Sequence, residues 1–287
     1  MPQELEIKLT LTQESLARAL SWLAGEGVAR DEGSLRLRNR YFDTPNGDLN
    51  ANRVALRIRS VDGRYIQTLK TKGAFVNGAH DRQEWEWPVP GAHLDLSLLQ
   101  QTPLDKSIDV SELAPVFDTD FERHVIMLND DQTAIECAFD HGVIRAGDRE
   151  RPLCELELEL KSGDDAKLLD WATQLSRQVP VFLNLISKAE QGYYLAGLHD
   201  PRWTGASASL EALFQGLSLV WLTGTCPEGL METLAAFESR AAELDLRAEW
   251  LWLSEQIKPG AVDCHDLLQD ARLGRFQLAL LRAGAGQ

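Results

Sequence analysis

Short segments that alternate between apolar and polar residues dominate the first two hundred residues. Successive side chains of a strand point to opposite faces, so a period of two predicts strands with one apolar face. Six such segments are bounded by turn residues: 4–11, 54–61, 65–72, 82–89, 133–144 and 152–161. The dipeptides Asp62-Gly63 and Asn77-Gly78 lie where tight turns are needed. The series predicts an antiparallel sheet or barrel.

Helical periodicity interrupts this pattern in three places. Thr12 can cap a helix that ends at Gly25 or Gly27, and Asp164 can cap a second one. A shorter helix is predicted over residues 187–198. Amphipathic helices of this kind can cover the apolar face of a sheet.

The chain changes character near residue 200. A segment rich in Gly, Pro, Ala and Ser, 197–209, separates residues 1–200 from residues 201–287. The second part has helical periodicity and no strand signal. It is expected to form a small helical region, with one long helix over residues 228–258 that ends at a Pro-Gly pair.

The charges of the predicted strands are sorted by face. In the strand that starts at Glu4, the residues Glu4, Glu6 and Lys8 alternate with Leu5, Ile7 and Leu9. Later strands place the following residues on one face each: Arg57 with Arg59; Lys70 with Lys72; Arg82 with Glu84 and Glu86; Glu136 with Asp140; Glu155 with Glu157 and Glu159.

Such sorting predicts a charged interior. Three aligned glutamates repel one another unless cationic groups face them. Basic strands and bound divalent cations would supply that complement, and the aliphatic faces would then lie outside, beneath the helices. A cavity with Arg and Lys on one wall suits a triphosphate. Carboxylates in the same cavity suit Mg²⁺ or Mn²⁺ as the cofactor.

Composition and charge exclude several classes of partner and of catalytic site. The chain has 287 residues and a formal net charge of −15, which argues against nucleic acid or an anionic membrane as a partner. The four cysteines form no CxxC pair, and no Ser/His/Asp arrangement or GxxxxGK[ST] loop is present. The sequence shows no signal peptide and no apolar run long enough to span a membrane, so a cytoplasmic protein is expected.

These segments, in this order, resemble the CYTH superfamily of triphosphate tunnel metalloenzymes. The signature ExExK stands at Glu4-Leu5-Glu6-Ile7-Lys8, and a later ExExE stands at residues 155–159. Matching segments lie between them and after them: residues 41–44, 56–59, 68–70, 82–86, 121–123, Glu136 with Asp140, and 187–188. The resemblance covers residues 1 to about 200. It implies an α+β fold, mainly β, with an eight-stranded antiparallel tunnel flanked by helices.

The resemblance also implies roles for individual residues. Catalytic roles fall to Glu4, Glu6 and Lys8. Metal ligands or their supports are Glu4, Glu6, Glu155, Glu157 and Asp140, with Glu136 and Glu159 as weaker candidates. Phosphate contacts are Lys8, Arg57, Arg59, Lys70, Arg82, Arg123 and Lys188.

The implied reaction is metal-dependent hydrolysis of inorganic triphosphate to phosphate and diphosphate. Helices after the tunnel domain resemble the bacterial inorganic triphosphatase branch, in which a CHAD domain follows. Here residues 201–287 are too few for a complete CHAD domain and hold one histidine, His265. Alternatives are a class IV adenylate cyclase, a thiamine triphosphatase, and a non-catalytic polyphosphate or nucleotide sensor. The sequence leaves the oligomeric state open.

Overall fold

The computed structural model describes residues 5–71, 74–76, 79–81, 83–104, 108–130, 132–203, 205 and 209–284. Its strands are β1 (Glu6–Thr10), β2 (Ala29–Asp43), β3 (Ala55–Val61), β4 (Arg64–Lys70), β5 (Ala74–Val76), β6 (Ala79–Asp81), β7 (Glu84–Val89), β8 (Ala114–Asn129), β9 (Ala134–Ala146), β10 (Arg149–Ser162) and β11 (Phe182–Leu183). They join in one sheet of order β5-β6-β1-β10-β9-β8-β2-β3-β4-β7, with β11 beside β1. The paired strands that carry the site are antiparallel. Eight of the described strands have five or more residues, which agrees with the expected eight-stranded tunnel.

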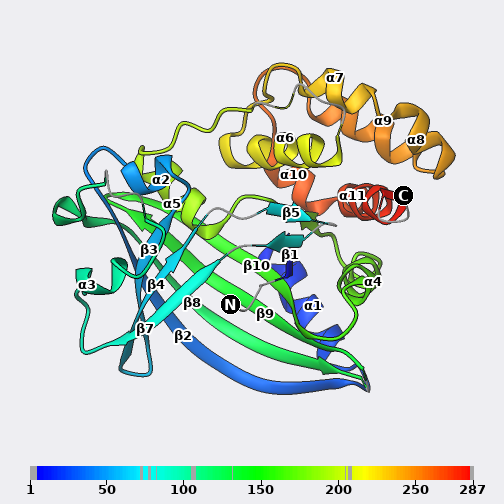
Figure 1. The fold of residues 1–287 in the computed structure, drawn as a ribbon. Coiled ribbons are helices and arrows are strands. Elements are labelled where there is room, and N and C mark those ends of the chain that lie inside the picture. Colours follow the sequence, from blue (N-terminus) through cyan, green and yellow to red (C-terminus); the bar gives the residue numbers. More distant parts are fainter. Residues whose placement is uncertain are drawn as a thin grey trace.

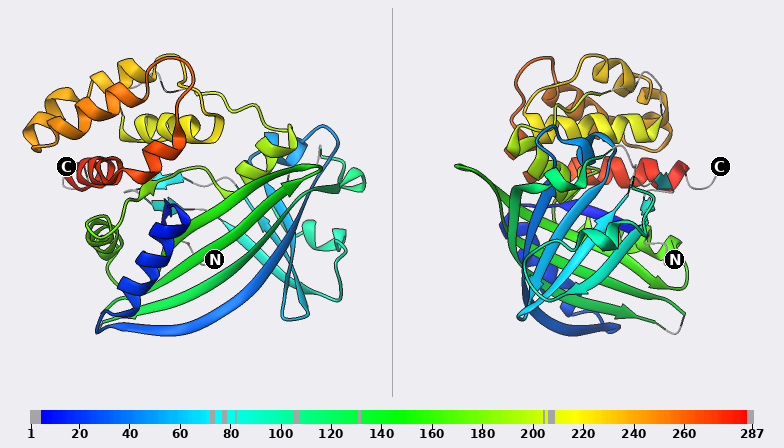
Figure 2. Two further views of the ribbon diagram at one scale, coloured as in Figure 1. Left: turned by 180° about the vertical axis from the view of Figure 1, so that it is seen from behind. Right: turned by 60° about the vertical axis from the view of Figure 1, so that its left-hand side comes forward.

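The helices are α1 (Gln13–Ala24), α2 (Asp48–Ala51), α3 (Leu96–Leu99), a 3-10 turn at Val110–Glu112, α4 (Ala166–Leu175), α5 (Lys188–Ala196), α6 (Leu210–Thr223), α7 (Leu230–Ala235), α8 (Glu238–Glu243), α9 (Arg247–Gln256), α10 (Cys264–Gln269) and α11 (Ala271–Gly284). Most helices lie outside the sheet (Figures 1 and 2), whereas α5 packs against its inner face, where the Tyr193 ring meets the Phe117 ring of β8. In the described part of the chain, no helix combines the length and the apolar character that crossing a membrane requires.

The two faces of the strands separate as the charge pattern predicts. On β1 and β10, Ile7, Leu9, Leu156 and Leu158 are fully buried in an apolar cluster outside the sheet, together with residues of α1 and α4 such as Leu16. The charged residues of the same strands therefore point to the opposite side, into the curve of the sheet. The predicted inside-out arrangement is confirmed.

Local signals place several elements correctly. The Thr12 side chain accepts a hydrogen bond from the Ser15 amide and caps α1, which ends at Gly25. Asp62 and Gly63 both have positive φ, 48° and 74°, as the two-residue turn between β3 and β4 requires. The other predicted turn, Asn77-Gly78, lies outside the described residues.

The two longest strands, β2 and β8, are not singled out by the alternation analysis. Along much of their length the outer faces are polar, because Arg36 and Arg40 pair there with Asp120 and Asp118, at 2.8 and 2.9 Å. The aliphatic part is short: on β8 it consists of Ile126 and Leu128, which lie in the buried cluster beneath α1. The alternation of Leu35 and Leu37 with arginines is the signal that could have found β2.

The long helix predicted over residues 228–258 is wrong. The chain forms three short helices there, α7, α8 and α9. Asp245 adopts a left-handed φ of 58° between the last two, which breaks the helical path. The breaks allow Leu234, Ala241 and Leu253, one from each helix, to reach the same buried cluster.

Helices α6 to α11, here called the tail, pack against the outside of the sheet. One apolar cluster contains Ile7 and Leu9 of β1 together with Leu213 and Phe214 of α6 and Phe276 of α11. Residues on both sides of position 200 thus share one core.

Helix α5 lies close to β8 because position 192 has no side chain. A Cβ placed on Gly192 would meet the Phe117 ring at 2.1 Å. We therefore expect Gly192→Ala to destabilise the protein by about 1–3 kcal/mol through overpacking. Thermal unfolding would measure the loss. Gly27→Ala is the matched control, since a Cβ there meets nothing within 4 Å. An equal melting temperature for both variants would contradict the close packing.

Candidate active site

The inner face of the sheet surrounds one cavity of about 760 Å³. Strands β3, β4 and β8 line it with cations, β7 and β9 with carboxylates, and β1 and β10 with both. Among the described residues, nine basic and eight acidic side chains contribute to its walls. These described residues thus give the cavity much charge but almost no excess of either sign.

Three glutamates lie abreast on neighbouring strands. The strand register places Glu6 of β1 opposite Glu159 of β10, and Glu159 opposite Glu136 of β9. All three line the cavity. Lys161 Nζ lies 2.8 Å from Glu159 and 3.6 Å from Glu136, so it offsets part of their repulsion. This glutamate row presents oxygen atoms to the cavity.

Farther along the same strands, two cations hold three carboxylates. Arg123 forms a two-point contact with Asp140, at 2.7 and 2.6 Å, and reaches Glu157 at 2.6 Å. Lys188 Nζ lies 2.9 Å from Asp140 and 2.7 Å from both Glu155 and Glu157. Two-point contacts between Arg and carboxylate are among the stronger charge-assisted hydrogen bonds. The cluster is therefore fixed before any substrate enters.

The pKa values reflect this pairing. Burial would lower the pKa of Lys188, but the charges of Asp140, Glu155 and Glu157 outweigh it and raise the pKa well above 10.5. Burial would raise the pKa of Glu157, but Lys188 and Arg123 hold it well below 4.5. For Lys8, burial prevails and lowers the pKa, although Glu155 and Glu6 oppose that shift.

The arginines of β3 are oriented from β2. Arg59 Nε donates to the Asn39 side chain at 3.0 Å, and the Asn39 amide donates to Thr119 at 2.9 Å. Burial and the neighbouring cations Arg57 and Arg123 lower the pKa of Arg59 to about 10. Arg59 therefore still carries its charge at neutral pH, in a position set by two fully buried polar side chains.

The model of the CYTH domain family matches residues 2–193, two thirds of the chain. The chain belongs to the CYTH domain family. An inorganic triphosphatase from Haemophilus influenzae is 34% identical to it over 204 residues, which cover 68% of this chain and 55% of that protein. This chain thus spans little more than half the length of that curated relative.

Two solved structures that resemble this chain have lower sequence identity to it than the Haemophilus protein has. HpAC1 from Hippeastrum, a candidate adenylyl cyclase with a dominant triphosphatase activity, is 20% identical with a TM-score of 0.49; the match covers 67% of this chain and 95% of that one. A candidate adenylate cyclase from Bacillus halodurans is 23% identical with a TM-score of 0.43 and covers 63% and 95%.

Most of the site residues predicted for this CYTH domain line the one cavity. They are Glu6, Lys8, Arg57, Arg59, Lys70, Arg123, Glu157 and Lys188, with the weaker candidates Glu136 and Glu159. Asp140 and Glu155 are fully buried behind the wall, where Arg123, Lys188 and the Gln191 amide bind them. Glu4 and Arg82 lie outside the described residues, as does Lys72.

Sequence reasoning did not assign a role to several lining residues of this domain. Lys161 continues the parity of Glu155, Glu157 and Glu159, so the alternation could have identified it. Glu211 and Gln215 of α6 also line the cavity. No sequence signal places these two there, because only the docking of the tail brings α6 to the cavity.

The donor set of the CYTH cavity fits a hard divalent cation that keeps other ligands. No group of three or more His, Cys, Asp or Glu side chains in the described part of the chain is arranged to hold a metal ion by itself. Mg²⁺, however, is commonly bound through one or two carboxylates, with waters and substrate phosphates in the remaining positions. The glutamate row and Glu157 supply oxygen donors of that kind at the cavity wall.

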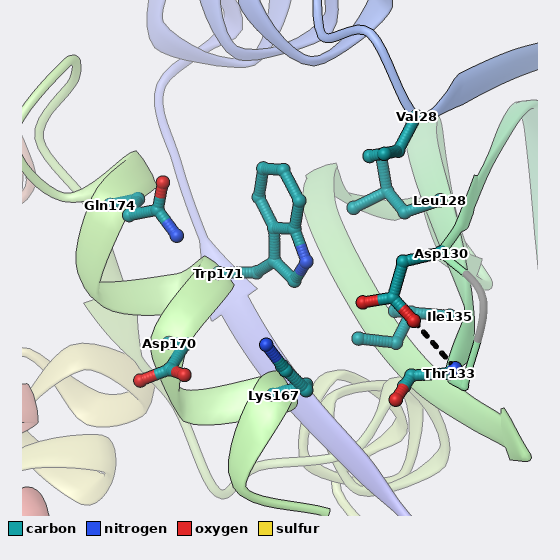
Figure 3. Close-up of a pocket in the computed structure, with 9 residues that line it drawn as sticks. All are labelled: Val28, Leu128, Asp130, Thr133, Ile135, Lys167, Asp170, Trp171 and Gln174. Carbon is teal, nitrogen blue, oxygen red and sulfur yellow. Dashed lines mark hydrogen bonds between the residues drawn. The ribbon is translucent and has the colours of Figure 1, made fainter. Parts of the chain in front are cut away.

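A second, smaller hollow of about 120 Å³ lies apart from these residues, between α4 and the turn from β8 to β9 (Figure 3). The Trp171 ring forms one side of it. Of its acidic residues, Asp130 accepts the backbone amide of Thr133 at 2.7 Å, and Asp170 pairs with Arg282 at 2.8 Å. Its carboxylates thus serve local structure.

The depressed pKa of Glu157 makes part of the stability depend on pH. A carboxyl group whose pKa is lower in the folded state stabilises it above the unfolded pKa, and that contribution disappears as pH falls through the folded pKa. The melting temperature of the wild type should therefore drop more steeply from pH 5 to pH 3 than that of Glu157→Gln. Glu150→Gln is the control, an exposed glutamate of the same strand that should behave like the wild type. Parallel profiles for wild type and Glu157→Gln would contradict the shift.

Proposed function

We propose that this CYTH protein is a metal-dependent inorganic triphosphatase that releases phosphate and diphosphate. The observation that supports it best is a single cavity whose described walls carry many cations and carboxylates at nearly balanced charge. A bare polyanion would gain little from such a cavity, because the carboxylates repel it as the cations attract it. A triphosphate accompanied by divalent cations complements both walls.

The cationic wall would hold the phosphates. Arg57 and Arg59 enter from β3, Lys70 from β4 and Arg123 from β8, and all line the cavity. Arginine can contact two phosphate oxygens at once, so this wall favours a chain of phosphates. Asn39 and Tyr41 fix the two β3 arginines, at 3.0 and 3.4 Å. Lys8 adds a fifth cation from the carboxylate side.

The carboxylate wall would hold Mg²⁺ or Mn²⁺ through Glu6, Glu157 and the neighbouring Glu159. A bound divalent cation would supply charge neutralisation for the leaving diphosphate. Glu6 is 5% exposed and lies opposite Glu159. The carboxylate oxygens of this row could therefore accept the proton of an attacking water. Water then adds to the terminal phosphorus, and the bond to the diphosphate oxygen breaks. Asp140 and Glu155 act indirectly, by fixing Arg123 and Lys188.

Two broader assignments accompany this function. Residues 1–200 would form the CYTH tunnel and residues 201–287 a partial CHAD-like helical region, in a cytoplasmic protein. The related reactions on ATP and on thiamine triphosphate, and a sensor without turnover, are outcomes that the following assay distinguishes.

Phosphate release from inorganic triphosphate, ATP and thiamine triphosphate, measured side by side with Mg²⁺, Mn²⁺ or EDTA, tests the proposal. We expect fast, metal-dependent turnover of inorganic triphosphate and slower turnover of the other two. Cyclic AMP formation from ATP would instead indicate a cyclase. Tight binding of inorganic triphosphate without turnover would indicate a sensor.

The same assay tests the glutamate row. Glu6→Gln should lose turnover by about a hundredfold or more, since a metal or proton acceptor is removed. Its melting temperature should be equal to or above that of the wild type, because the charge facing Glu159 is gone. Glu122→Gln, on the exposed outer face of β8, is the matched control and should keep wild-type activity. Wild-type turnover by Glu6→Gln would remove the row from the mechanism.

A further inference from the structure

The segment between β11 and α5, residues 184–187, contacts Lys8 and leads directly into Lys188. Its Asn184 amide donates to the Lys8 carbonyl at 3.2 Å, and its Asn184 side chain donates to Thr10 at 2.9 Å. The Lys8 ammonium donates to the Ile186 carbonyl. The inner side of this segment therefore sets where the Lys8 side chain ends.

The same segment starts helix α5. The Ser187 hydroxyl accepts a hydrogen bond from the Glu190 amide at 3.1 Å and caps the helix, whose first residue is Lys188. A shift of the segment would thus move Lys188 away from Glu155 and Glu157, which it contacts at 2.7 Å. Both lysines line the cavity.

The outer side of the segment is held by the tail. The buried Gln277 side chain of α11 accepts the Leu183 amide and donates to the Leu183 carbonyl, each at 2.9 Å. The side-chain amide of Gln277 thus forms the two backbone hydrogen bonds that a neighbouring strand would otherwise form with Leu183 at the edge of β11. On α6, the Ser218 hydroxyl accepts the Leu185 amide at 3.0 Å.

The packing around these bonds leaves the segment little freedom. Helix α11 approaches so closely that a Cβ on Gly274 would meet the Val181 carbonyl oxygen at 2.4 Å. Arg151 of β10 fixes the end of α6 through the Leu222 carbonyl, at 3.0 Å, and lies over the Trp221 ring. The face of α6 that carries Glu211 and Gln215, four residues apart, lines the cavity itself.

We propose that Gln277 and Ser218 are positioning residues of the active site. Through the backbone of Leu183 and Leu185, they hold the segment that binds the Lys8 ammonium and leads into Lys188. The tail would then contribute to substrate binding by positioning Lys8 and Lys188. This inference rests on the proposed function, because it assigns these lysines to the phosphate and metal site.

Steady-state kinetics of Gln277→Leu on inorganic triphosphate with Mg²⁺ test the proposal. The variant keeps the size of the side chain but leaves two buried backbone groups of Leu183 without partners. We expect KM to rise by about fivefold or more as the lysines shift. Ser218→Ala should change KM in the same direction by a smaller factor, and it carries the test if Gln277→Leu fails to fold.

Trp250→Phe is the matched control. It removes a 2.9 Å hydrogen bond from Trp250 to the Leu234 carbonyl, which lies wholly within the tail. A variant that is merely less stable has fewer folded molecules, which lowers the apparent kcat but leaves KM unchanged. KM should therefore stay at the wild-type value in Trp250→Phe.

The outcomes separate the two claims. A wild type that turns over no triphosphate would overturn the proposed function. An active wild type whose KM is unchanged by Gln277→Leu and by Ser218→Ala would overturn the positioning role alone.

Discussion

The balance of charge inside the curved sheet is the constraint on which the rest of this molecule depends. Glu6, Glu159 and Glu136 stand side by side on three strands, and like charges in that position destabilise a sheet. Lys161 offsets this repulsion by contacting Glu159 and Glu136, and farther along the same strands Lys188 and Arg123 pair with the buried carboxylates of Asp140 and Glu157. Breaking such a buried pair costs more than the pair contributes, so each charge depends on its partner.

The charged inner faces of β1 and β10 leave their apolar residues on the outside. The aliphatic faces of β1 and β10 would be exposed to water without α1, α4 and the tail, which bury them in one shared cluster. The tail consequently packs against the strands that carry the glutamates, and from there α6 and α11 reach the segment before Lys188. The need to cover the outside of the tunnel thus brings the tail to the site.

Alternation of single strands was enough to predict the charged interior, most of the strands and most residues of the cavity. It could not show that Asp140 and Glu155 lie behind the wall, because parity gives the face of a residue but not its depth. Nor could it place Glu211, since the position of α6 depends on packing between distant segments. The prediction of one helix over residues 228–258 was wrong because helical periodicity does not reveal that the chain turns at Asp245.

The central claim is that divalent cations complete the balance of charge around a triphosphate. Anomalous scattering from crystals grown with Mn²⁺ and a non-hydrolysable triphosphate analogue tests it most directly. We expect a manganese peak beside Glu6, Glu157 and Glu159, with phosphates on Arg57 and Arg59. An analogue seated in the cavity with no manganese at these carboxylates would contradict it.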